Sequence, residues 1–135
     1  MDLVSVIIPY YRKRNFVKET LTSVVNQDYD NLEVLIIYDD TNLNDLEFLQ
    51  KITKSDSRIK IIKNDAKLGA GFSRNIGIDK SNGKYIAFLD ADDIWSLDKL
   101  KSQISFMKQN NHKISHTSYY IIDDKKKIIG QRRAR

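Results

Sequence analysis

The chain has 135 residues, of which 41% are hydrophobic and 30% are charged, and its formal net charge is +5. This amount of apolar material excludes intrinsic disorder and suffices for one ordinary core, so a single domain is predicted. The chain has no cysteine, which excludes disulfides and thiolate metal sites and leaves oxygens and histidines as metal ligands.

Short apolar runs alternate with helical patterns along the first two thirds of the chain. The expected elements are, in order, a strand over 3–8 that stops at Pro9, a helix capped by Asn15 that ends near Asn26, a strand over 32–38, a helix over 44–55, a strand over 59–62, a helix over 72–80 and a strand over 85–89. Such β-branched runs are typical of strands buried on both faces of a parallel sheet. The predicted fold class is therefore α/β, a three-layer α/β/α Rossmann-like fold with a mostly parallel central sheet.

The last third of the chain is predicted to add a helix and a pair of strands. Ser96 is expected to open the helix, with Leu97 and Leu100 among its inward residues, and the strands are expected over 115–122 and 127–129. The basic C-terminal end, 123–135, is interpreted as solvated rather than as a nucleic-acid site.

Targeting signals are missing from the sequence. No basic stretch precedes an apolar one at the N-terminus, and no apolar run approaches the ~20 residues of a spanning helix. A cytoplasmic protein is expected, and peripheral association with the inner face of a membrane is left open.

Three polar clusters follow predicted strands, namely 9–12, 39–40 and 90–93. Sheets of this class bind ligands outside the carboxyl ends of their strands. We therefore expect these clusters, which are distant in sequence, to converge on one edge of the sheet.

The acidic cluster carries the strongest chemical signal. Asp90, Asp92 and Asp93 directly follow an apolar run, and carboxylates this close repel one another unless a cation neutralises them. Hard Mn²⁺ or Mg²⁺ prefers carboxylate oxygens and keeps positions open for phosphate oxygens. The cluster therefore predicts a metal ion that bridges the protein and a diphosphate. The alternative is that the aspartates cap the next helix or lie solvated in a turn, but capping needs only one carboxylate.

Four motifs in order, Val6–Arg12, Leu35–Asp40, Gly71–Ile78 and Phe88–Asp93, resemble those of the family-two inverting glycosyltransferases, which have the GT-A fold. The resemblance spans Val4 to about Trp95, and a weaker similarity continues to Gly130. A single Asp-x-Asp pattern is weak, whereas four ordered motifs on predicted strand ends are specific. The resemblance implies the nucleotide-sugar-binding part of such an enzyme, a hexosyl- or N-acetylhexosaminyl-transferase.

The resemblance also implies roles for residues in the first three motifs. Pro9 and Tyr11 would flank the nucleobase, Asp39 would accept a hydrogen bond from uracil N3, and Asp40 would support that loop. Arg74 would neutralise the diphosphate. This sequence continues Asp39-Asp40 with Thr-Asn where the family often has Gly-Ser, which changes the loop more than the carboxylate.

In the fourth motif, the resemblance assigns Asp90 to the ribose hydroxyls and Asp92 to the metal, and Asp93 to the loop or the sugar. Ala91 lies between them and is included in the substrate-binding set. The implied partners are a UDP-sugar donor and a glycan or lipid-linked acceptor, with no nucleic acid and with a homodimer left open. Polysaccharide, glycan or lipid synthesis is the implied process.

No catalytic base is evident in the sequence. Inverting transfer needs a base near the acceptor hydroxyl, and the family's carboxylate is expected beyond Arg135. The chain is therefore expected to be a donor domain over 1–135, truncated at the C-terminus and without an acceptor-binding part. Two alternatives stay open: a haloacid-dehalogenase-like phosphatase, with Asp90 as nucleophile and Asp92 as acid, and a non-catalytic nucleotide- or RNA-binding module.

Overall fold

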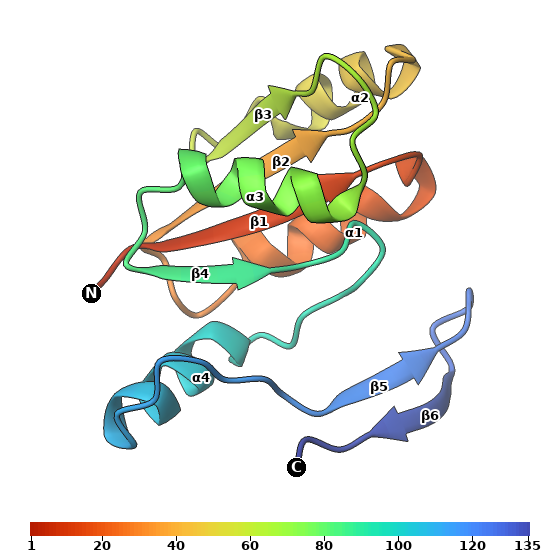
Figure 1. The fold of residues 1–135 in the computed structure, drawn as a ribbon. Helices are drawn as coiled ribbons and strands as arrows, with labels where there is room; N and C mark the ends of the chain where they lie inside the picture. Colours follow the sequence, from red (N-terminus) through yellow and green to blue (C-terminus); the bar gives the residue numbers. More distant parts are fainter. The chain divides into compact units, whose positions relative to one another are not determined.

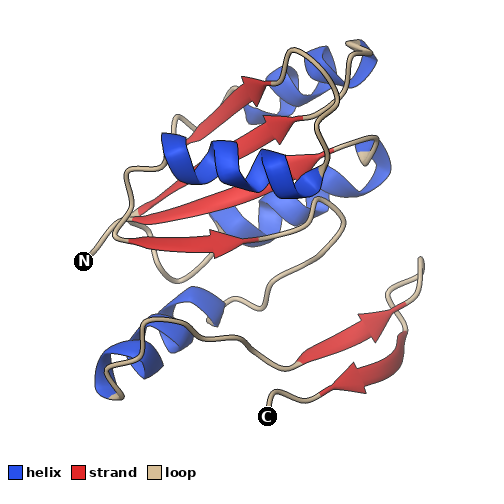
Figure 2. Cartoon of the chain, viewed as in Figure 1, coloured by secondary structure: helices blue, strands red, loops and turns tan.

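The apolar runs form a parallel four-stranded sheet in the computed structural model, which describes residues 1–135. The chain divides into two units, Met1–Leu97 and Asp98–Arg135. The elements of the first unit are β1 (Val4–Tyr10), α1 (Arg14–Val25), β2 (Leu32–Tyr38), α2 (Asn44–Thr53), β3 (Ile59–Lys63), α3 (Ala70–Lys80) and β4 (Tyr85–Phe88). The strand order is β3-β2-β1-β4, and the four strands run in the same direction (Figure 2). The predicted α/β class with a mostly parallel sheet is confirmed.

Helices cover both faces of this sheet. The chain moves from β1 through α1 to β2 and through α2 to β3, and α3 then returns it past β2 and β1 to β4. Because parallel crossovers are right-handed, steps in opposite directions place their helices on opposite faces. Figure 1 shows α3 on one face and α1 and α2 on the other, and α3 contacts β1 and β2. The strand order reverses between β1 and β4, where sheets of this kind bind ligands.

The core lies along the two central strands, and every residue of β2 is buried. On the α3 face, Ile7, Leu35 and Ile37 form a buried cluster. Gly77 of α3 faces this cluster, and a Cβ atom at that position would lie 2.4 Å from Ile7 Cγ2. Glycine is therefore what allows α3 to approach β1 this closely.

The first strand does not stop at Pro9, as the sequence suggested, but continues to Tyr10. The Leu89 N–H donates to the Ile7 carbonyl, so odd-numbered residues of β1 direct their backbone groups toward β4. Pro9 therefore faces the side where β4 has already ended, since the last β1–β4 pair is Ile7 with Phe88. A proline without an N–H is tolerated there because no ladder bond is lost.

Three predicted helix starts are wrong, and the smallest error is at α3, which begins at Ala70 rather than at 72. The first helix begins at Arg14, and its first turn is closed by the Lys13 carbonyl, which accepts from the N–H groups of 16 and 17, so Asn15 is not a cap. The helix expected from Ser96 begins at Lys99 instead. The carbonyls of 96 and 97 accept hydrogen bonds from Gln27 and from the N–H of residue 28, which holds this stretch outside the helix. Leu97, expected to be inward, is 64% exposed.

The second unit contains α4 (Lys99–Gln109), β5 (Tyr119–Ile122) and β6 (Ile128–Arg132). The two strands pair antiparallel, which confirms the predicted strand pair, although β5 begins at Tyr119 rather than at 115 and β6 extends to Arg132 rather than to 129. Asp123 shapes the turn between them, because its carboxylate accepts from the N–H groups of Lys125 and Lys127. Across the whole chain, no helix combines the length and apolar character that a membrane span requires.

Candidate functional site

A pocket of about 320 Å³ lies at the carboxyl ends of the strands, beside the reversal of strand order. Its lining comes from the ends of β1, β2 and β4 and from the start of α3. The lining residues are Pro9, Tyr10, Tyr11, Lys13, Asp39, Ala70, Arg74, Asp90, Ala91 and Asp92. The structure thus brings together the three polar clusters that the sequence placed at strand ends. Two of the residues singled out in the sequence, Asp40 and Asp93, lie outside this lining.

Asp39 lies at the end of β2 and is 2% exposed. Its Oδ1 atom accepts hydrogen bonds from Asn64 Nδ2 (3.0 Å) and the Leu68 N–H (2.7 Å), and its Oδ2 atom accepts from the Gly69 N–H (2.8 Å). A carboxylate has about four acceptor positions, so one remains on Oδ2. Asp39 therefore anchors the loop between β3 and α3 and retains one acceptor position for a ligand donor.

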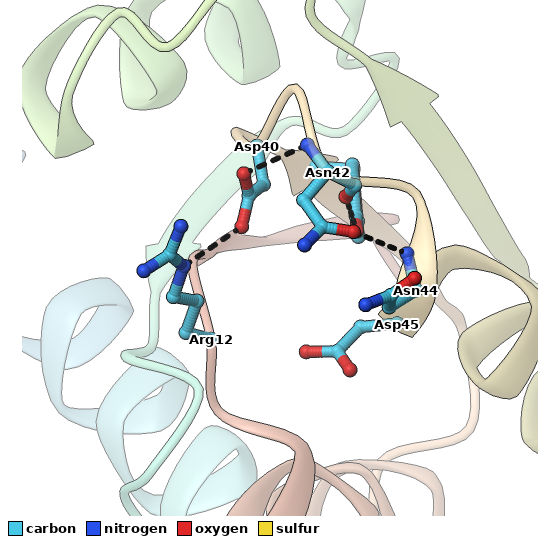
Figure 3. Close-up of a pocket in the computed structure, with 6 residues that line it drawn as sticks. Arg12, Asp40, Asn42, Asn44 and Asp45 are labelled. Carbon is cyan, nitrogen blue, oxygen red and sulfur yellow. Dashed lines mark hydrogen bonds and ion pairs between the residues drawn. The ribbon is translucent and has the colours of Figure 1, made fainter.

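Asp40 points into a neighbouring pocket of about 210 Å³ (Figure 3). Its carboxylate accepts from the Asn42 N–H (2.9 Å) and from Arg12 Nε (3.2 Å). These two contacts, in that order, lower the pKa of Asp40 below its usual range. Arg12 has a φ of 51°, a left-handed conformation uncommon outside glycine. This ion pair joins the loop after β1 to the loop after β2.

Tyr11 forms one wall of the larger pocket. The Lys67 Nζ atom lies 3.5 Å from the centre of the Tyr11 ring, and the Arg12 guanidinium carbon lies 4.9 Å from it. Cations over an aromatic face are attracted by its negative quadrupole. Lys67 therefore holds the β3–α3 loop against Tyr11, next to the part of that loop that Asp39 anchors.

Arg74 lies one turn inside α3, which begins at Ala70 rather than at 72. Gly69 has a φ of 91° and makes the turn into the helix possible. The Arg74 Nη2 atom lies 3.0 Å from Asp90 Oδ1. The close approach of α3 to β1 at Gly77 thus places the Arg74 guanidinium next to the acidic cluster after β4.

The acidic cluster consists of Asp90, Asp92 and Asp93, whose nearest carboxylate oxygens all lie within 4.8 Å of one another. Lys13, at the start of α1, places its Nζ atom 3.0 Å from Asp92 Oδ2. The pKa of Asp93 is raised, first by partial desolvation and then by the negative charges of Asp92 and Asp90. Three oxygen donors at this spacing fit a hard divalent ion. In the structure, the side chains of Arg74 at Asp90 and Lys13 at Asp92 offset part of the repulsion among the carboxylates.

Sequence reasoning missed three residues that shape this site. Lys13 follows the Pro9–Arg12 cluster directly, so its position after a strand was a usable signal. Asn64 and Lys67 meet Asp39 and Tyr11 across long separations in sequence, and no local spacing indicates such contacts.

Comparison with known proteins gives a family and three similar proteins. Residues 5–135 match the family described as Glycosyl transferase family 2. The chain is 40% identical over 133 residues to the Escherichia coli UDP-Glc:alpha-D-GlcNAc-diphosphoundecaprenol beta-1,3-glucosyltransferase WfgD, covering 96% of this chain and 50% of WfgD.

Among solved structures, S. aureus TarS 1–349 in complex with UDP-GlcNAc is 26% identical with a TM-score of 0.72, covering 82% of this chain and 32% of that chain. The mannosyltransferase PcManGT from Pyrobaculum calidifontis, solved with GDP-Man and Mn²⁺, is 18% identical with a TM-score of 0.73, covering 89% of this chain and 35% of that chain, and shows likeness of fold alone. The chain spans at most half the length of these three proteins.

Proposed function

The chain belongs to glycosyl transferase family 2 and has the GT-A fold, and from this premise we propose that it binds a UDP-sugar through a divalent metal ion, for inverting transfer of the sugar to an acceptor hydroxyl. One observation supports the proposal: the lining of a single pocket joins Tyr11, Asp39 and Arg74 to Asp90 and Asp92 of the acidic cluster. This joining favours a nucleotide-sugar site over the phosphatase alternative, which gives Asp39 and Arg74 no role. Residues 1–135 are proposed to act as one donor domain.

The base end of the donor is proposed to lie between the loops after β1 and β2. Pro9 and Tyr11 would flank the uracil ring, and Asp39 Oδ2 would accept from N3–H with its remaining acceptor position. Cytosine carries no proton at N3, so a carboxylate there discriminates between the two bases. Since three other hydrogen bonds already fix Asp39, little side-chain entropy would be lost on binding. Asp40 is proposed to support the loop through Arg12 and the Asn42 N–H.

The diphosphate end is proposed to lie over the acidic cluster. Asp90 would bind the ribose hydroxyls and Asp92 would bind Mn²⁺ or Mg²⁺, while Asp93 would orient the loop or reach the sugar. Lys13 would release Asp92 as a ligand for the metal, and Lys13 and Arg74 would then face phosphate oxygens. The Lys13–Asp92 pair is partly exposed, and pairs of this kind contribute at most ~1 kcal/mol, so the exchange costs little. When bound, the metal would stabilise the negative charge of the departing nucleoside diphosphate.

The acceptor is proposed to be a glycan or a lipid-linked sugar. WfgD is named for a diphosphoundecaprenol-linked acceptor, and TarS was solved with UDP-GlcNAc. These names support a hexosyl- or N-acetylhexosaminyl-transferase, and the lipid carrier in the name of WfgD supports action at a membrane, for which we propose the inner face.

A calorimetric titration of the full chain with UDP tests the proposal. UDP is expected to bind more tightly with Mn²⁺ than with EDTA, and CDP is expected to bind at least about tenfold more weakly than UDP. A UDP-sugar panel under the same conditions would then identify the donor. Equal affinities for UDP and CDP, or no binding of UDP at all, would contradict the proposal. Heat stabilisation by phosphate analogues with Mg²⁺ but not by UDP with Mn²⁺ would favour the phosphatase instead.

A further inference from the structure

A polar stripe lies against the segment that carries the acidic cluster, and it is formed by Thr20 and Ser23 of α1 and by Gln27, which follows the C-terminal end of the helix. Thr20 and Ser23 are three residues apart and so lie on one face of α1, and the Gln27 side-chain amide donates to the Ser23 carbonyl at 3.0 Å. Thr20 is completely buried and Gln27 is 3% exposed. Polar side chains at such depth need hydrogen-bond partners, and here the partners lie in the segment that follows β4.

Each stripe residue bonds a backbone group of this segment. The Thr20 hydroxyl donates to the Ala91 carbonyl at 3.0 Å. The Ser23 hydroxyl accepts from the Trp95 N–H at 3.1 Å. The Gln27 side-chain amide donates to the Ser96 carbonyl at 2.6 Å. The stripe thus fastens the main chain on both sides of Asp92 and Asp93.

Two ion pairs also hold the side chains of this segment, Arg74–Asp90 and Lys13–Asp92. Leu89 and Ala91 are buried, whereas Asp90, Asp92 and Asp93 lie on the exposed side. The turn has one internal bond of its own, from the Asp93 N–H to the Asp90 carbonyl at 3.1 Å. The two cations offset part of the repulsion among the three carboxylates, but they contact the side chains, whereas the hydrogen bonds from Thr20, Ser23 and Gln27 hold the backbone that carries them.

We propose that Thr20, assisted by Ser23 and Gln27, is a positioning residue that sets the spacing of the acidic cluster for the metal and the diphosphate. The Thr20–Ala91 bond acts at the residue between Asp90 and Asp92, so it controls the direction in which both carboxylates point. This inference rests on the proposed donor site. It adds a second element, α1, to the parts of the fold that determine metal affinity.

Two substitutions isolate the Thr20 hydroxyl. Thr20→Val keeps the shape of the side chain and removes the donor, and Thr20→Ser restores the donor. Thr53→Val is the matched control, because the Thr53 hydroxyl is also buried and donates to a carbonyl, that of Leu49 in α2, at 2.8 Å. Both valine variants are expected to lower the melting temperature, so stability alone does not distinguish them.

The discriminating readout is the Mn²⁺-dependent gain in UDP affinity, measured by calorimetry well below the melting temperature, with uridine as a second ligand. In Thr20→Val the gain is expected to fall about tenfold, as for partners that orient metal ligands. Uridine affinity should fall much less, because Asp39, which would bind the base, lies on another loop and only the ribose contact of Asp90 would be affected. Thr20→Ser should recover the gain, and Thr53→Val should keep it.

Amide hydrogen exchange over residues 89–96 completes the test. Faster exchange is expected in Thr20→Val and not in Thr53→Val. If Thr20→Val does not fold, Ser23→Ala takes its place with the same expectations. If Mn²⁺ increases the UDP affinity of the wild type and of the Thr20 or Ser23 variant equally, the positioning role is overturned and the proposed function stands. No gain in the wild type would overturn the proposed function as well.

Discussion

Replacing Asp39 with asparagine tests whether this carboxylate holds the β3–α3 loop. The substitution conserves shape and removes the charge. An asparagine can direct its oxygen toward Asn64 and the Leu68 N–H, but its NH₂ group then faces the Gly69 N–H, where the oxygen now accepts at 2.8 Å. Asp39 is 2% exposed, so water cannot replace the lost acceptor.

The expected cost follows from that geometry. A hydrogen bond to a charged group contributes about 1.5–3 kcal/mol, and an unsatisfied buried N–H costs about 1–3 kcal/mol. We expect Asp39→Asn to lower the free energy of unfolding by about 2–3 kcal/mol. At about 3–4 °C per kcal/mol for a chain of this size, the melting temperature should fall by roughly 6–12 °C.

Urea denaturation followed by circular dichroism and by the fluorescence of the single tryptophan, Trp95, measures this cost. Coincidence of the two transitions is required before a free energy is derived, because the chain has two units. Asp65→Asn is the control, since Asp65 is exposed in the same loop, and it should change stability by less than about 0.5 kcal/mol. A loss below about 1 kcal/mol in Asp39→Asn would refute the anchoring role.

Four further outcomes concern the acidic cluster and its partner Arg74. Asp92→Asn should abolish the Mn²⁺-dependent gain in UDP affinity measured by calorimetry, whereas Asp124→Asn, the same change in the turn between β5 and β6, should preserve it. Ionised Asp93 would add negative charge beside the metal position proposed at Asp92. Its pKa is raised by desolvation and by Asp92 and Asp90, so Mn²⁺ affinity should fall as the pH is lowered toward that pKa. Because the pKa of Asp93 is higher in the folded state, protonation of this carboxyl stabilises the fold. This stabilisation is present below the ordinary carboxyl pKa and is lost as the pH rises through the pKa of the folded state. Urea denaturation at a series of pH values should show that Asp93→Asn removes this pH dependence. Arg74→Gln should weaken UDP binding about tenfold and leave uridine binding unchanged, because uridine lacks the phosphates that the guanidinium would face.

The sheet could be predicted because its strands are continuous apolar runs, and the run over 32–38 matches β2 to the residue. The helix starts could not, because α1 and α4 begin without a side-chain cap that a pattern would reveal. At Ser96 a long-range bond from Gln27 overrides a local preference for a helix start. The spacing of residues along the sequence does not indicate tertiary contacts of this kind.

The candidate site shows the same division. The carboxylates after β2 and β4 could be placed at the sheet edge from their position after apolar runs. Their partners could not, since Asn64, the Gly69 N–H and Thr20 reach the site from other elements. The sequence thus indicates which groups do the chemistry, and the fold determines what orients them.

Gly77 shows how a residue without a functional group can control one. It lies on α3 three positions after Arg74, so both belong to the same side of the helix. Because Gly77 has no side chain, α3 packs directly against Ile7. This packing places the Arg74 guanidinium within 3.0 Å of Asp90 Oδ1. The distance between Arg74 and Asp90 therefore depends on the absence of a side chain at Gly77, a residue with no polar side-chain atom. A larger residue at this position would push α3 away from β1 and increase that distance.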